Sequence, residues 1–118
     1  MYYLKIISLE GCPYSDAVEQ LVKNNNINSK IIKINQFEKF KYKVSDIETF
    51  PQIYLEKKYS SGSVLIGGYS KLKSYFDSIH SLSPNSKKLD ILKNKINKEN
   101  KDLSKKSVLR LIQLLANY

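Results

Sequence analysis

Residues 1–15 read MYYLKIISLEGCPYS, and this stretch decides the fold. Its first nine residues are rich in Tyr, Ile and Leu and are soon followed by Gly11, a pattern typical of a buried strand. Apolar residues recur at helical spacing over residues 16–24, and Pro13 stands where the first turn of a helix tolerates a missing N–H group. The stretch therefore predicts a strand followed at once by a helix, with Cys12 at the junction.

Working outward, the sequence continues with strand and helix patterns up to residue 82. A strand, a helix and a second strand form a βαβ unit, and two further strands around a polar turn form a hairpin. The predicted order is β-α-β-α-β-β-α, an α/β fold with a four-stranded mixed sheet and three flanking helices. The further elements are a strand at residues 30–35, a helix at 36–44 with Phe37, Phe40 and Val44 on one face, strands at 51–56 and 63–66, and a helix at 71–82 capped by Ser70.

Residues 81–88 have the composition of a linker, and two more helices are predicted beyond them, at residues 89–97 and 103–117. The second is apolar around much of its circumference between Val108 and Leu115, and such a helix needs a surface to pack on. That surface is either the chain's own helices or another subunit. We divide the chain into a domain at residues 1–83 and a basic helical extension at residues 84–118.

The net charge of +9 lies mostly in this extension. Residues 1–83 carry eleven lysines against eight acids, whereas residues 84–118 carry nine basic residues against three acids. Such a tail can attract an acidic protein, but the single arginine, Arg110, argues against nucleic-acid binding, because bidentate readout favours arginine. The apolar runs are too short to span a membrane and the N-terminus lacks the pattern of a secretory signal, so we expect a soluble, cytoplasmic protein.

Cys12 is the only cysteine, so no internal disulfide can form. A free cysteine often packs as a small apolar side chain, and that interpretation stays open. At the N-terminal end of a helix, however, the unpaired N–H groups and the helix dipole favour the thiolate, which is the reactive form. We expect the backbone N–H groups of Tyr14 and Ser15 to donate to the sulfur, with help from the Ser15 hydroxyl.

Two weaker signals lie further along the chain. Pro51 opens an apolar strand, where it is either an ordinary edge proline or part of a cis Phe50–Pro51 bond that exposes the backbone of Phe50 beside Cys12. Gly67 and Gly68 precede a helix, and they either form an ordinary turn or leave N–H groups open to a ligand carboxylate. Neither signal identifies a function alone.

Together the three motifs resemble those of the glutaredoxin family. Its members carry C-P-Y-C or C-P-Y-S, then T-V-P, then G-G; here CPYS stands at residues 12–15, TFP at 49–51 and GG at 67–68. The spacings, 39 residues from Cys12 to Pro51 and 16 from Pro51 to Gly67, are close to those of the family. The resemblance covers about residues 3–82 and implies a thioredoxin-like fold with a monothiol active site.

The resemblance also implies an activity, that of a glutathione-dependent thiol-disulfide oxidoreductase in electron transport, with glutathione as co-substrate. Cys12 would attack the sulfur of a glutathionylated protein or a small mixed disulfide, and a second glutathione would free it. Ser15 stands where dithiol members carry a second cysteine. The residues carried over are Cys12 as nucleophile, then Pro13, Tyr14, Ser15 and Pro51 as its support, and Tyr14, Thr49, Phe50, Pro51, Gly68, Tyr69, Ser70 and Lys71 as the glutathione site.

Two departures from the family weaken the expected glutathione site. The family often has a basic residue where Leu9 stands and an aspartate where Lys71 stands. This chain therefore lacks a partner for the glycyl carboxylate and another for the γ-glutamyl ammonium. The alternative is a binding protein that keeps the fold, turns over weakly and docks a partner through its helical tail.

Metal and oxyanion chemistry is less well supported. A [2Fe–2S] cluster bridged between two subunits occurs in some single-cysteine glutaredoxins, but Pro13-Tyr14 argues against it, since the cluster-assembly branch typically carries Gly-Phe there. Arsenate reduction, the activity of another single-cysteine relative, would need several arginines for its oxyanion. His80 has no cysteine or histidine at ligand spacing, so we expect a surface histidine and no metal site.

Overall fold

The computed structural model describes residues 1–43, 47, 49–60, 62–81 and 86–116. The predicted boundary between residues 83 and 84 lies outside these residues. None of the described helices is both long enough and apolar enough to cross a membrane.

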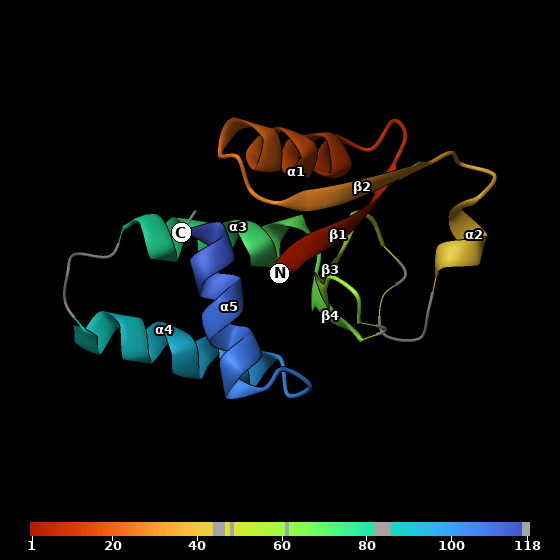
Figure 1. The fold of residues 1–118 in the computed structure, drawn as a ribbon. Helices are drawn as coiled ribbons and strands as arrows, with labels where there is room; N and C mark the ends of the chain where they lie inside the picture. Colours follow the sequence, from red (N-terminus) through yellow and green to blue (C-terminus); the bar gives the residue numbers. More distant parts are fainter. Residues whose placement is uncertain (44–46, 48, 61, 82–85, 117–118) are drawn as a thin grey trace.

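A four-stranded mixed sheet forms the centre of the fold (Figure 1), as the sequence predicts. Its strands, in spatial order, are β2 (Ser29–Ile34), β1 (Tyr2–Leu9), β3 (Gln52–Lys57) and β4 (Ser63–Gly67). β1 runs parallel to β2 and antiparallel to β3, and β3 runs antiparallel to β4. β1 and β3 are therefore the two central strands, and β1, which leads into α1, is paired on both sides.

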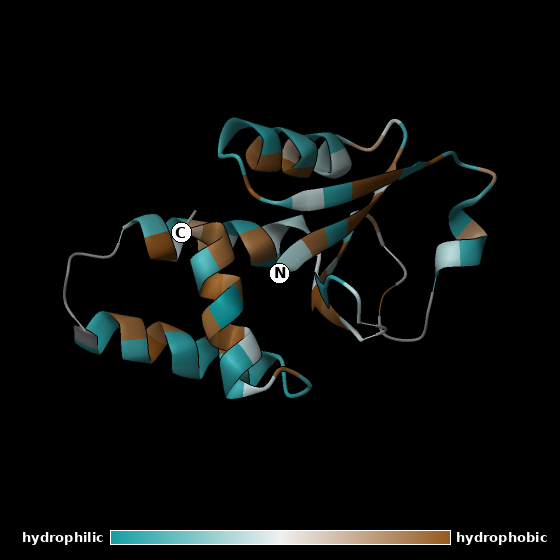
Figure 2. Ribbon diagram, in the orientation of Figure 1, coloured by the Kyte–Doolittle hydropathy of each residue, from teal (hydrophilic) through white to brown (hydrophobic). Residues whose placement is uncertain are grey.

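Five helices are described; three connect or follow the strands of the sheet, and two come after them at the C-terminal end. α1 (Pro13–Asn24) connects β1 to β2, and α3 (Tyr69–His80) follows β4, whereas α2 (Lys39–Tyr42) is a single turn. Two C-terminal helices, α4 (Ser86–Glu99) and α5 (Lys105–Leu115), form the extension. Figure 2 shows hydrophobic residues recurring between hydrophilic ones along α4 and α5, the pattern of helices with one buried side.

The second helix predicted from the sequence is wrong in length and in packing. Only the four residues of α2 are helical, and Phe37 and Phe40 are 90% and 70% exposed. The side-chain Oδ1 of Asn35 accepts hydrogen bonds of 2.9 Å from the N–H groups of Phe37 and Glu38, which forms a local turn in place of a helical turn. Val44, the third residue of the predicted face, lies outside the described residues.

The predicted cap of α3 is also wrong. Gly68 is the N-cap, with extended φ and ψ of −100° and −168°, and Tyr69 is the first helical residue. The preceding Gly67 has a φ of +142°, a conformation open to glycine, and it turns the chain directly from β4 into the helix. Ser70 therefore falls inside the first turn, where it is exposed.

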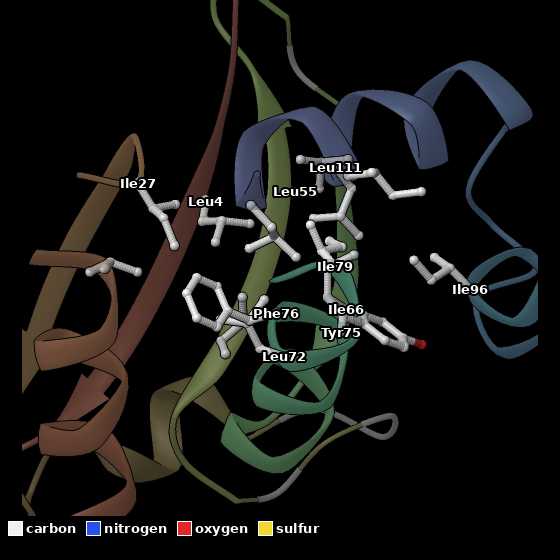
Figure 3. Packing of buried hydrophobic residues seen from close by; sticks show 14 of the residues in the cluster. Leu4, Ile27, Leu55, Ile66, Leu72, Tyr75, Phe76, Ile79, Ile96 and Leu111 are labelled. Carbon is white, nitrogen blue, oxygen red and sulfur yellow. The ribbon is translucent and has the colours of Figure 1, made fainter. Parts of the chain in front are cut away.

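The main hydrophobic core lies between one face of the sheet and helices α1, α3 and α5 (Figure 3). Leu4 and Ile6 of β1 are fully buried in it. Because successive side chains of a strand point to opposite faces, Ile7 lies on the other face, where it packs with Ile34 and Phe50 in a smaller cluster.

The C-terminal extension is part of the main core. α4 and α5 contact α3, and α5 also contacts β1. His80, at the end of α3, is exposed overall but forms a hydrogen bond of 3.0 Å with the carbonyl of Leu115, and its ring lies 4.1 Å from that of Phe76. Of the two surfaces that the sequence leaves open, the extension uses the chain's own helices. Its buried apolar side chains are Leu92, Ile96, Leu103, Val108, Leu111, Ile112 and Leu115.

Replacing Ile96 with alanine tests whether the extension and the sheet unfold together. Ile96 is fully buried on α4, so we expect the free energy of unfolding to fall by about 2–5 kcal/mol, because the missing atoms leave a cavity. The matched control is Ile91→Ala, the same change on the same helix at a side chain that is 67% exposed, where a change within about 0.5 kcal/mol is expected. Urea denaturation followed by circular dichroism measures both. A loss confined to a separate, earlier transition would show that the extension unfolds alone.

Candidate active site

Cys12 lies at the tight turn between β1 and α1, as predicted. β1 ends at Leu9, and Gly11 adopts a φ of +79° to reverse the chain. The N–H group of Cys12 donates to the carbonyl of Leu9 at 3.1 Å, and Pro13 opens the helix. Cys12 is thus the N-cap of α1, with a partly exposed side chain.

Ser15 closes this turn from inside the helix. Its side chain is fully buried, and its hydroxyl oxygen accepts a hydrogen bond of 3.0 Å from the N–H group of Leu9. The expectation that the N–H groups of Tyr14 and Ser15 donate to the Cys12 sulfur is wrong for this structure, because the Cys12 side chain makes no capping hydrogen bond. Ser15 holds the turn, and its oxygen is committed to the end of β1.

The Cys12 sulfur faces the segment that precedes β3. Its thiol donates to the carbonyl oxygen of Phe50 at a sulfur–oxygen distance of 3.6 Å. The Phe50–Pro51 peptide bond is cis, as one of the two interpretations of the sequence predicts. Pro51 is buried, whereas Thr49 is exposed at the outer edge of this segment.

The N-terminus of α3 forms the other side of the site. A Cβ atom built on Gly68 would lie 3.7 Å from the carbonyl oxygen of Pro51, so the glycine packs closely against the proline segment. The ring of Tyr69 lies 6.1 Å from the ring of Tyr14, centroid to centroid, at an interplanar angle of 33°. The first N–H groups of any α-helix have no partner within the helix, so this end of α3 offers donors beside the two rings.

Not all of the predicted site residues lie around Cys12 in the structure. Three contacts bring the site together: Cys12 with Phe50, Gly68 with Pro51, and Tyr14 with Tyr69. The side chain of Lys71 is directed elsewhere, since its ammonium group contacts Asn100 Oδ1 at 3.0 Å and the carbonyl of Glu99 at 3.5 Å. Sequence reasoning missed this contact because nothing local links residues 29 positions apart.

Metal ligands do not cluster anywhere in the described residues. No group of three or more His, Cys, Asp or Glu side chains there could hold a metal ion. His80 is bonded to a backbone carbonyl of the extension and stacks on Phe76, so its contacts are structural.

The comparisons with known proteins agree with this geometry. A sequence model of the glutaredoxin family matches residues 1–59. Among solved structures, the chain is similar to the crystal structure of glutaredoxin 1 from Francisella tularensis complexed with cacodylate, with a TM-score of 0.53 and 26% sequence identity. That match covers 70% of this chain and 100% of the other. A search of curated proteins found no match.

Removing the Ser15 hydroxyl tests its role in holding the turn. In Ser15→Ala the partly buried N–H group of Leu9 loses its acceptor, so we expect the free energy of unfolding to fall by about 1–3 kcal/mol. Ser74→Ala, the same change at an exposed position of α3, should have little effect. Thermal and urea denaturation measure both variants. Equal stability of the two would mean that the hydroxyl has no structural role in the turn.

Proposed function

The chain belongs to the glutaredoxin family, whose members are generally thiol oxidoreductases, and from this premise we propose that it reduces glutathione mixed disulfides through Cys12 alone. The observation that carries the proposal is the position of Cys12 at the N-terminus of α1, with its sulfur against the Phe50 carbonyl. Tyr14, two residues further on, lies beside Tyr69 at the start of α3. Glutathione is the co-substrate, and the substrates are glutathionylated proteins or small mixed disulfides. A reducing compartment such as the cytoplasm suits a single thiol of this kind.

The proposed reaction has two exchange steps. The Cys12 thiolate attacks the glutathione sulfur of the mixed disulfide, the substrate sulfur leaves and takes up a proton, and a Cys12–glutathione disulfide forms. The thiolate of a second glutathione then attacks the glutathione sulfur of that disulfide and releases Cys12. The two electrons that reduce the substrate come from glutathione, which leaves as its disulfide.

The surrounding residues support these steps in different ways. Cys12 stands at the N-terminus of α1, and a helix N-terminus favours a negative charge such as that of a thiolate. The N–H groups at the start of α3 would donate hydrogen bonds to the γ-glutamyl carboxylate, with the rings of Tyr14 and Tyr69 alongside. Ser15 cannot resolve the intermediate, because it has no thiol, so the second glutathione is required.

The alternative function, a weakly active protein that docks a partner through its tail, receives less support. The apolar sides of α4 and α5 are already packed on α3 and β1, so they are not free to bind another protein. The outward side of the extension carries most of its lysines, and this positive charge would favour acidic substrates over neutral ones.

A glutathione-coupled assay on a glutathionylated disulfide tests the proposal directly. We expect turnover by the wild-type protein and none above background by Cys12→Ser, because a hydroxyl cannot carry out the exchange. Ser74→Ala serves as an active control, and a melting curve shows that the Cys12 variant is folded. Turnover that survives in Cys12→Ser, or its absence from the wild type, would contradict the proposed function.

A second experiment addresses the charge at residue 71. In Lys71→Asp a short carboxylate in the first turn of α3 can meet the γ-glutamyl ammonium, so we expect the KM for glutathione to fall by about two- to fivefold. Lys73→Asp is the matched control, because it makes the same change of charge two residues further along the helix. A KM that rises, or that falls equally in both variants, would mean that the γ-glutamyl end lies elsewhere.

A further inference from the structure

Lys71 occupies an unfavourable position for a cation. It lies in the first turn of α3, where the helix dipole places partial positive charge. The side chain does not stay there, because its stem packs over Gly67, with Lys71 Cδ only 3.0 Å from where a Cβ on that glycine would lie. The stem thus leads away from the start of α3 toward the extension.

The ammonium group ends at a favourable position on another helix. Its contacts, the carbonyl of Glu99 at 3.5 Å and Oδ1 of Asn100 at 3.0 Å, lie at the C-terminus of α4, where the helix dipole favours positive charge. The extension therefore supplies the site that holds this cation.

Asn100 is itself held rigidly. Its side chain is buried, and its amide nitrogen donates to the carbonyl of Ile96 at 2.8 Å and to the Tyr75 hydroxyl at 3.1 Å. The Tyr75 hydroxyl in turn donates to Glu99 Oε1 at 2.5 Å. Burial and the hydrogen bond to Glu99 raise the pKa of Tyr75 well above its ordinary value, so the phenol keeps its proton at neutral pH. With both amide hydrogens engaged, the Asn100 oxygen faces Lys71.

We propose that the C-terminal extension is a positioning element for the Cys12 site, in which Asn100 holds the Lys71 ammonium away from the N-terminus of α3. The proposal rests on the proposed function, because its consequence concerns the ammonium at the γ-glutamyl end of glutathione. With Lys71 turned toward α4, that ammonium can approach the start of α3 without meeting a second cation.

The first turn of α3 is close enough to the proposed glutathione site for the charge of Lys71 to matter there. Gly68 packs on Pro51 and Tyr69 lies beside Tyr14, so a cation released at the first turn of α3 would lie beside the proposed glutathione site. The Lys71 side chain also has room to leave, because a pocket of about 310 Å³ borders it, between β4 and the connection from α4 to α5. Asn100 Oδ1 is the nearer of the two acceptors of the Lys71 ammonium, and it therefore has the larger part in setting where this charge lies.

The central experiment is a double-mutant cycle on the KM for glutathione. Asn100→Ser leaves a side chain too short to reach Lys71, and we expect the KM to rise by about two- to fivefold with kcat unchanged. Lys71→Met keeps the apolar stem over Gly67 and removes the charge, so adding Asn100→Ser to it should not raise the KM further. Asn94→Ser, the same change at an exposed position of α4, is the matched control.

A second ligand and a second variant sharpen the test. For glutathione whose α-amino group is acetylated, Asn100→Ser should not raise the KM, because no ligand ammonium remains to be repelled. Asn100→Asp keeps an oxygen acceptor facing Lys71, so it should leave the KM for glutathione at or below the wild-type value even if the serine variant does not fold.

The outcomes separate the two proposals. An equal rise of KM with Asn100→Ser in the Lys71 and Lys71→Met backgrounds, no rise in either, or a rise in Asn100→Asp would overturn the positioning role. Absence of any glutathione turnover by the wild-type protein would instead overturn the proposed function. Turnover that depends on Cys12 but is indifferent to Asn100 would leave that function standing without the inference.

Discussion

The candidate site depends on the tightness of the turn between β1 and α1. The hydrogen bond from the Leu9 N–H group to Ser15 closes it, and a bond of 2.6 Å from the Ser8 hydroxyl to Glu19 ties the same strand to the helix one turn further on. Because β1 is paired on both sides, the N-terminal end of α1 is fixed relative to the whole sheet. The register that sets Ile7 opposite Gln52 then brings the preceding proline segment to the level of Cys12.

Features governed by neighbours in the chain could be predicted from the sequence. A proline at the first helical position and a pair of glycines before a helix act through local backbone geometry, so Pro13 and Gly67 marked the starts of α1 and α3 closely. Where two local rules competed, the outcome could not be read from the sequence. Ser70 has a strong capping preference, but the chain had already entered the helix at Tyr69, and the Asn35 side chain formed a turn where periodicity indicated a helix.

Contacts between distant residues explain what the sequence left open. The apolar sides of α4 and α5 required a partner surface, but periodicity does not say which surface, and only the packing of Leu111 and Ile96 beside α3 identifies it. Likewise, Ser15 was assigned to the sulfur because it is close in sequence, whereas its oxygen is used by Leu9. The resemblance to the family places Lys71 at the ligand, whereas its ammonium group contacts Asn100, which follows α4.

Gly67 has a consequence for how this protein can vary during evolution. Its backbone conformation already favours glycine, and any Cβ there would also press on the stem of Lys71. Gly67 is therefore fixed by its own backbone, whereas Lys71 and Asn100 depend on each other through their contact. A relative that loses the extension keeps the glycine but frees position 71 to change. Covariation of positions 71 and 100, beside an unchanging glycine, would be the evolutionary trace of the extension packing on the domain.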